Sequence, residues 1–350
     1  MGLTLSQETL SLALRDPFRI ARSAAGEGTR ITTVIVELRD DRYPGVVGVG
    51  EGYPDAYYGE TPATTEVVLE ELLSGIGEPE LTSAGLVGAT HAMDRTIRWN
   101  GAAKCALDIA LHDLAGKVQG MPVHRLLGLP AGGPPTDFSI GIDEPGVVAE
   151  RARRAADFPA LKIKCGSPAD LVTLRAVRDV YAGPIRVDAN TGWTRADAQR
   201  LLPDLVDLGV ELIEQPFPPR AYRDLGWLQD RSSLPIVADE SVVTDEDLDA
   251  LVGVVAGVNV KLAKCGGIGP ARAMLERARE LGFRTFLGCM EETSVGIGGS
   301  AVVASFADWV DLDGCLLLAD DPFEGLELDP DHRWILPERP GLGLARRPRD

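Results

Sequence analysis

The chain is poor in the residues that build zinc sites and disulfide frameworks. It has four histidines and five cysteines among 350 residues, and no C-x-x-C motif occurs. The cysteines are odd in number and widely spaced, and the histidines do not gather beside them. We therefore expect neither a zinc site nor disulfides, and we expect a reducing, cytoplasmic location.

The chain also lacks an excess of positive charge and any long apolar run. It carries 35 Lys and Arg against 53 Asp and Glu, a formal net charge of −18. Nucleic acids and anionic membranes bind basic surfaces, so we expect neither as a partner. No uninterrupted apolar run reaches about 18 residues, and no basic segment followed by an apolar stretch opens the chain, so we expect no membrane span and no secretory signal.

A regular repeat of short apolar runs occupies the middle of the chain. The runs lie at residues 161–164, 187–190, 213–216, 238–241 and 260–264. Each contains a charged residue at its end, and these residues recur every 22 to 26 positions: Lys164, Asp188, Glu214, Asp239 and Lys261. A strand, a helix and two loops fill such an interval, so the spacing predicts successive βα units.

The same interval extends the series in both directions. Similar runs lie at 137–141, 284–288 and 309–313, and helical patterns at 171–180 and 270–281 separate some of them. Eight βα units predict a closed parallel barrel, whose active site lies at the C-terminal ends of the strands. The charged residues fall at that end.

The flanking regions differ from the repeat. Residues 32–38 alternate like a strand, 46–50 could pair with them, and helical patterns follow at 64–73 and 102–117. We therefore expect an α+β domain at 1–125 and a barrel at 126–320. The segment 321–350, rich in Pro, Asp and Arg, should pack on the N-terminal domain.

Two loops of the N-terminal domain could cover the barrel mouth. One spans 18–28 and contains Arg19 and Arg22, and the other, 52–60, contains three tyrosines. Long loops beside a barrel mouth often act as lids. An ordinary surface loop fits both segments equally well.

Three carboxylates end neighbouring strands of the predicted barrel. Asp188, Glu214 and Asp239 would converge there and repel one another unless a cation lies among them. Oxygen ligands without His or Cys suit a hard divalent ion, so the pattern favours Mg²⁺. Asn190 could add a neutral oxygen. The alternative is three unrelated acidic residues at loop entries.

Lysines end two strands that would face each other across the barrel. Lys162 and Lys164 share one face of the second strand, and Lys261 ends the sixth. A substrate carbon between them would have an amine on each side. A lysine acts as a base only when neutral, so its pKa must fall, and a nearby cation lowers it. Phosphate or carboxylate binding is the alternative role.

These motifs together resemble the enolase superfamily, in its muconate-lactonizing subgroup. Segment 103–117 also resembles the helix of that subgroup's capping domain, and 340–343 its usual ending. The resemblance covers nearly the whole chain and implies a modified TIM barrel of (β/α)7β type, capped by an α+β domain built from both termini. It also implies Mg²⁺ on the three carboxylates and a lysine acid/base pair, a combination established in that superfamily. The pair would be Lys164 and Lys261, with Lys162 assisting.

An Asp-x-Asp sequence ends the eighth strand. Asp311 and Asp313 share a face there, and two such anions suggest a cationic partner, for example a substrate ammonium. The motif resembles the element by which dipeptide epimerases hold the α-amino group. The same likeness places Ser139 and Cys289 at substrate-contacting positions. A loop entry or a salt bridge is the alternative.

The resemblance implies epimerisation of a dipeptide at the α-carbon of its C-terminal residue, through an enolate stabilised by Mg²⁺ and Lys162. Arg22 lies where a cation could meet an acidic side chain, so L-Ala-D/L-Glu is the leading substrate. Glu291 and Glu292 follow the seventh strand without an assigned role. Whether the chain forms a homo-oligomer stays open.

Other functions fit parts of the same pattern. A muconate-type cycloisomerase or an o-succinylbenzoate synthase would share the site, but their substrates have no amine for Asp311 and Asp313. A Schiff-base aldolase could use a lysine on the sixth strand without a metal. A non-catalytic ligand-binding barrel would not need the complete set of carboxylates and lysines.

Overall fold

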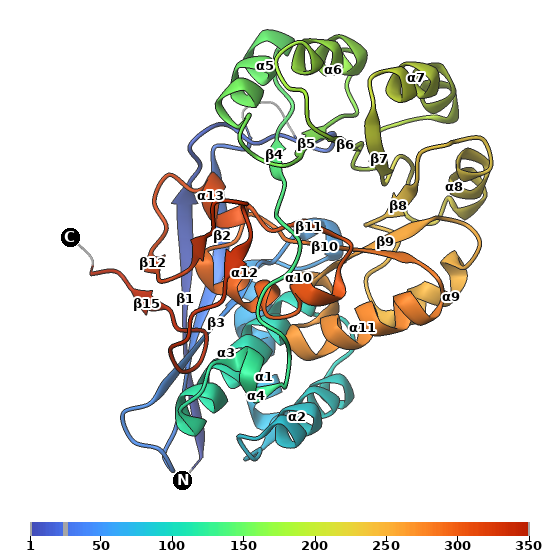
Figure 1. Cartoon of the computed structure of the whole chain (residues 1–350). Coiled ribbons are helices and arrows are strands. Elements are labelled where there is room, and N and C mark those ends of the chain that lie inside the picture. Colours follow the sequence, from blue (N-terminus) through green and yellow to red (C-terminus); the bar gives the residue numbers. More distant parts are fainter. Residues whose placement is uncertain (1, 24–26, 349–350) are drawn as a thin grey trace.

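The computed structural model describes residues 2–23 and 27–348 (Figure 1). At its centre eight parallel strands, β4 to β11, lie side by side in sequence order. Just before β4, Thr136 forms a bridge with Val310, and the Asp137 N–H donates to the Val310 carbonyl at 3.1 Å. The first strand therefore meets the last, and the predicted barrel is confirmed as a nearly closed one.

Each barrel strand overlaps one of the predicted apolar runs, although several strands begin and end a few residues earlier than predicted. They are β4 (Phe138–Ile140), β5 (Leu161–Lys164), β6 (Ile185–Asp188), β7 (Val210–Glu214), β8 (Ile236–Ala238), β9 (Gly257–Lys261), β10 (Arg284–Gly288) and β11 (Trp309–Asp311). The helices that follow them are α5 (Pro145–Arg154), α6 (Asp170–Arg178), α7 (Arg195–Asp207), α8 (Tyr222–Gln229), α9 (Leu248–Leu251), α10 (Leu262–Cys265), α11 (Ile268–Glu280), α12 (Ser294–Ala301) and the short α13 (Gly314–Leu317).

An antiparallel sheet and four helices form the N-terminal part. They are β1 (Leu3–Ala13), β2 (Arg30–Asp40), β3 (Val47–Gly52), α1 (Pro62–Ile76), α2 (Ser83–Thr96), α3 (Gly101–Gln119) and α4 (Val123–Leu126). The sequence pattern predicted β2, β3, α1 and α3 but missed α2, α4 and β1. The apolar residues of β1 do not alternate regularly, because Leu3 and Leu5 pack against the cap core whereas Leu10 packs against the barrel core.

Alternate glycines bring β3 into direct contact with α3. A Cβ at Gly48, Gly50 or Gly52 would lie within 2.2 Å of a backbone carbonyl oxygen of that helix. Glu51, between two of these glycines, is fully buried and accepts hydrogen bonds from the Thr293 N–H at 3.0 Å and the Gly296 N–H at 2.9 Å. The cap is thus tied to the chain that follows β10.

The C-terminal segment folds back over the N-terminal part. Its strands are β12 (Phe323–Glu324), β13 (Glu327–Leu328), β14 (Trp334–Ile335) and β15 (Ala345–Arg346), and β12 pairs with β15 and β13 with β14. The Leu342 N–H donates to Asp113 of α3 at 2.8 Å, and Arg346 pairs with Glu8 of β1 at 2.5 Å. The segment also contacts the barrel, where Trp334 Nε1 donates to the Leu312 carbonyl at 3.0 Å. The domain bounds 1–125, 126–320 and 321–350 stay a prediction. Among the described helices, none is both long and apolar enough to cross a membrane.

Candidate active site

The predicted charged residues meet at the C-terminal ends of the barrel strands. Lys164, Asp188 and Glu214 occupy the last positions of β5, β6 and β7 and lie side by side in the ladder. Asp239 follows β8 directly, and Lys261 ends β9. All five are buried, so every charge needs a partner inside the protein.

Lys162 connects the carboxylates across the barrel. Its Nζ lies 2.7 Å from Asp311 Oδ2, 2.8 Å from Glu214 Oε2 and 3.3 Å from Asp188 Oδ2. Burial acts to lower the pKa of Lys162, but the three carboxylates outweigh it and hold that pKa well above its usual range. Lys162 therefore stays charged. Asp311 therefore already has a cationic partner, and the same lysine contacts two of the proposed metal ligands, Glu214 and Asp188.

The two proposed proton-transfer lysines stand on opposite sides of the barrel. Lys164 comes from β5, the second strand in the order, and Lys261 from β9, the sixth. Lys164 Nζ lies 2.7 Å from Asp188 Oδ2, and Lys261 Nζ lies 3.1 Å from Asp239 Oδ2. Burial acts to lower the pKa of Lys261, yet Asp239 raises it above its usual range. For Lys261, the expected fall in pKa is not found while this pair is formed.

Two buried residues of the site were missed by the sequence reasoning. Lys264 Nζ pairs with the Asp239 carboxylate and also donates to the Asp239 carbonyl at 2.7 Å. Asn259 Nδ2 donates to Glu214 Oε1 at 2.7 Å. The signal was present, because Asn259 lies two residues before Lys261 on one face of β9, and Lys264 completes a Lys-x-x-Lys sequence.

The oxygen donors of the site fit a hard divalent cation. Among the described residues, Asn190 Oδ1 and Glu240 Oε2 are buried oxygens without a hydrogen-bond donor, and Glu214 Oε2 has only its ion pair with Lys162. Burial and the neighbouring Asp188 raise the pKa of Glu214 to about 7. Within the described residues no three acidic, His or Cys side chains already converge on one point, because lysines pair with the carboxylates. The donor chemistry of these oxygens suits Mg²⁺.

A second acidic site lies where β11 meets β4. The Ser139 N–H donates to Asp313 Oδ2 at 2.5 Å, and Ser139 Oγ donates to Asp311 Oδ1 at 3.1 Å. Burial raises the pKa of Asp313 well above its usual range, and the Asp311 charge adds to the effect. Asp311 is already neutralised by Lys162, whereas Asp313 accepts from a neutral donor. Cys289 is buried and lines one cavity together with Asp311 and Asp313.

Arg22 reaches the mouth from the cap but is not a free cation. Its Nη1 lies 2.5 Å from Glu240 Oε1 and donates to the Asn190 carbonyl at 3.0 Å. Its guanidinium carbon lies 4.0 Å from the centre of the Tyr57 ring. Glu240 was not among the predicted site residues, although it directly follows the predicted ligand Asp239. Positions 24–26 of the loop predicted at 18–28 lie outside the described residues.

Both cap loops contribute to the catalytic cavity, which has a volume of about 70 Å³. Phe18 and Tyr58 line it, and the Phe18 ring centre lies 5.7 Å from Lys164 Nζ. Glu291 also lines it, whereas Glu292 is fully buried beside Glu51, and burial and that neighbour raise the pKa of Glu292 to about 8. Glu292 therefore belongs to the junction of cap and barrel.

Two family models together match most of the chain. The model described as mandelate racemase / muconate lactonizing enzyme, N-terminal domain, matches residues 5–128. The model described as enolase C-terminal domain-like matches residues 147–349. These two segments correspond to the cap and to most of the barrel and tail.

Curated and solved proteins resemble the chain along nearly its full length. An L-Ala-D/L-Glu epimerase of Bacteroides thetaiotaomicron is 37% identical over 339 residues, covering 96% of this chain and 86% of that protein. A dipeptide epimerase of Enterococcus faecalis, solved with Mg and L-Leu-L-Tyr, has a TM-score of 0.89 at 32% identity and covers 99% of this chain and all of that one. A substrate-liganded L-Ala-D/L-Glu epimerase of Bacillus subtilis has a TM-score of 0.90 at 28% identity, covering 98% of this chain and 99% of that one.

Proposed function

Because the chain belongs to the mandelate racemase/muconate lactonizing enzyme family of the enolase superfamily, we propose that it is an isomerase that epimerises dipeptides. The reaction inverts the α-carbon of the C-terminal residue and depends on Mg²⁺. One observation carries the proposal. Two lysines from opposite strands flank a cavity that is also lined by a buried aspartate, Asp313, which forms no ion pair with any residue that the structure describes.

Asp188, Glu214 and Asp239 are the residues that would hold the cation. When bound, Mg²⁺ supplies positive charge beside the substrate carboxylate and makes the α-proton more acidic. The likeness to epimerases solved with Mg supports this assignment. Lys264 and Asn259 position the carboxylates through their contacts with Asp239 and Glu214.

The lysines divide the proton transfer between two faces of the substrate. Lys164 removes the α-proton from one side and Lys261 delivers a proton from the other, or the reverse. Lys162 is held in its charged form by Asp311, Glu214 and Asp188. It therefore stabilises negative charge on the substrate and does not act as a base.

Two aspartates at the end of β11 would bind the amino-terminal end of the substrate. Asp311 and Asp313 receive the α-ammonium group, and Asp313 gains the cation that it lacks. L-Ala-D/L-Glu is the leading substrate, supported by the L-Ala-D/L-Glu epimerases among the similar proteins and by Arg22 at the mouth. The substrates of a cycloisomerase or an o-succinylbenzoate synthase would leave Asp313 without a cationic partner. A cytoplasmic location and a homo-oligomer stay predictions.

Incubation of a dipeptide library in D₂O with Mg²⁺ tests the proposal. We expect a gain of one mass unit at the C-terminal α-carbon of accepted dipeptides and the appearance of both epimers. A matched incubation with a chelator should abolish both. Exchange that persists after complete metal removal contradicts the metal assignment, and turnover of muconate-type substrates without exchange into any dipeptide contradicts the epimerase assignment.

A further inference from the structure

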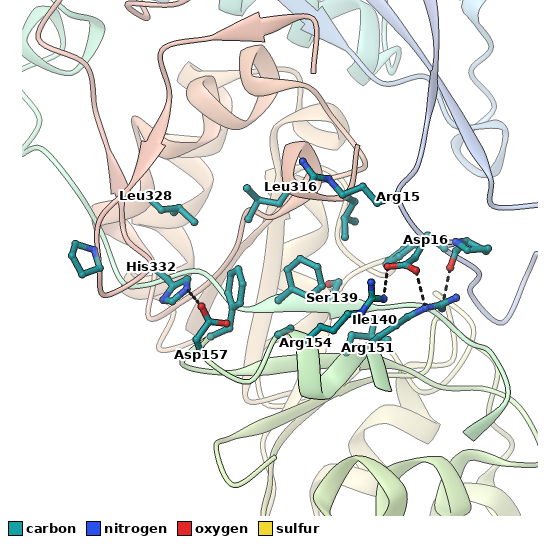
Figure 2. Close-up of a pocket in the computed structure, with 18 of the residues that line it drawn as sticks. Arg15, Asp16, Ser139, Ile140, Arg151, Arg154, Asp157, Leu316, Leu328 and His332 are labelled. Carbon is teal, nitrogen blue, oxygen red and sulfur yellow. Dashed lines mark hydrogen bonds and ion pairs between the residues drawn. The ribbon is translucent and has the colours of Figure 1, made fainter. Parts of the chain in front are cut away.

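One fully buried aspartate of the barrel interior does not line the catalytic cavity. Asp137 lies just before β4, and its N–H donates to the Val310 carbonyl of β11 at 3.1 Å. Figure 2 shows Ile140 of β4 in the lining of a separate cavity of about 580 Å³, on the outer face of that strand. Asp137 does not line this outer cavity either. Its side chain points into the barrel, where it pairs with Arg186 of β6.

The two carboxyl oxygens of Asp137 have different surroundings. Oδ2 accepts a hydrogen bond from Arg186 Nη1 at 2.8 Å. Oδ1 is buried, and among the described residues no hydrogen-bond donor reaches it. A buried carboxylate oxygen without a donor is costly, whereas a protonated carboxyl oxygen is itself a donor. A proton on Oδ1 would therefore satisfy Asp137, provided that an acceptor lies beside it.

Asp311 is the acceptor that lies beside Asp137. The two carboxyl groups are close enough to form a hydrogen bond, which requires a proton on one of them. Burial acts to raise the pKa of Asp311, but the Lys162 charge outweighs it and holds that pKa below its usual range. Burial also raises the pKa of Asp137, and the Asp311 charge adds to the effect. The shared proton therefore belongs to Asp137.

The ion pair with Arg186 does not require a charged Asp137. Arg186 Nε lies 2.8 Å from Glu211 Oε2, so the guanidinium already has an anionic partner. A neutral Asp137 still accepts from Arg186 through Oδ2. The other charged groups that act on Asp137 are Asp311 of β11, which favours the protonated form, and Lys162 of β5, which is itself paired with Asp311.

A protonated Asp137 fixes the Asp311 carboxylate from a side that the substrate does not reach. Asp311 already accepts from Lys162 Nζ at 2.7 Å and from Ser139 Oγ at 3.1 Å. A third donor, held by the ladder between β4 and β11, restricts its orientation further. An ionised Asp137 would instead repel Asp311 and compete with it for Lys162.

We propose that Asp137 is a positioning residue that stays protonated and donates a hydrogen bond to Asp311, and so holds this carboxylate in place for the substrate ammonium. The inference rests on the proposed epimerase function for the role of Asp311. The proton on Asp137 is a separate property of the barrel interior, and it is measured without turnover.

Infrared difference spectroscopy of the Mg²⁺-loaded protein at neutral pH tests for the proton. Subtracting the spectrum of Asp137→Asn from that of the unmodified protein should reveal the C=O stretch of one protonated carboxylic acid. Glu211→Gln is the matched control, because Glu211 also pairs with Arg186 and should leave that band unchanged. A difference spectrum for Asp137→Asn without a protonated-acid band overturns the inference.

The second measurement is kcat/KM for deuterium incorporation into L-Ala-L-Glu. Asparagine has nearly the shape of the neutral acid and keeps a donor, so Asp137→Asn should stay within about threefold of the unmodified protein. Asp137→Ala removes the donor and should lower kcat/KM about tenfold. Glu211→Ala, which removes the other carboxylate from Arg186, should change it by less than about twofold.

Three kinetic outcomes separate the possible roles of Asp137. Equal losses in Asp137→Asn and Asp137→Ala would show that the residue acts as a charge, and would overturn the inference. A loss in Glu211→Ala as large as that in Asp137→Ala would also overturn it, because Asp137 would then act only through Arg186. Absence of exchange into every dipeptide by the unmodified protein would instead overturn the proposed function. If Asp137→Ala fails to fold, the infrared spectrum and the activity of Asp137→Asn decide.

Discussion

The barrel mouth and the cap loops above it are held in place by different means. At the mouth, Lys164, Asp188 and Glu214 sit at the last ladder positions of adjacent strands and are buried. Above it, Arg22 comes from a loop and Tyr57 from the short 3-10 helix Ala56–Tyr58 within the other cap loop, and Tyr57 is 39% exposed. Strands fix atoms more closely than loops do, whereas loops vary more freely. We therefore expect the mouth to determine the reaction and the cap loops to adjust the choice of substrate.

The largest effect should follow removal of a lysine at the mouth. Lys164→Ala and Lys261→Ala should each lower epimerisation by roughly 10²- to 10⁴-fold, the usual contribution of a positioned acid or base. Each variant should still exchange deuterium into one stereoisomer, because the remaining lysine faces one side of the substrate. Chiral chromatography after incubation in D₂O measures both quantities.

Lys117→Ala provides the control for the loss of a lysine. Lys117 pairs with Asp113 at 2.6 Å in the cap, away from the mouth, so epimerisation should persist in the folded variant. A Lys164 or Lys261 variant that still epimerises at the normal rate would contradict the two-lysine mechanism.

The mouth was predictable from sequence because its geometry follows from local patterns. A charged residue after each short apolar run lies at a strand end, and parallel strands bring such ends together. The ion pair between Lys162 and Asp311 was not predictable, since it forms only when the barrel closes. Lys162 and Asp311 are separated by 149 positions, and no local spacing relates them.

A smaller effect should follow a change at the acidic site of β11. Asp313→Asn removes the charge that would bind the substrate ammonium. A hydrogen bond to a charged group contributes about 1.5 to 3 kcal/mol, so kcat/KM for a free dipeptide should fall roughly ten- to a hundredfold. An N-acetylated dipeptide should bind poorly to both proteins. Equal turnover of free and N-acetylated dipeptides by the unmodified protein would exclude ammonium recognition.

The cap was only partly predictable, and the physical reason differs. Its helices α1 and α3 follow from their periodicity, but the reach of its loops depends on contacts between distant segments. Arg22 and Glu240 are separated by 218 positions, and their pairing needs both domains in place. The sequence therefore indicated a cation near the mouth without indicating that it was already neutralised.

The smallest effect should come from Arg22, where the comparison between mouth and cap is most direct. Arg22 already pairs with buried Glu240 and stacks on Tyr57, so a substrate carboxylate would share a cation and not gain a free one. Arg22→Met should therefore lower kcat/KM for L-Ala-L-Glu less than the loss of an unshared charged hydrogen bond would, by roughly three- to tenfold. L-Ala-L-Gln, which has nearly the same shape and no charge, should change by less than about twofold. If both substrates lose activity equally, Arg22 acts by positioning Glu240 beside the carboxylates. The cap loop would then support the reaction and not select the side chain, and the division between mouth and cap would fail at this residue.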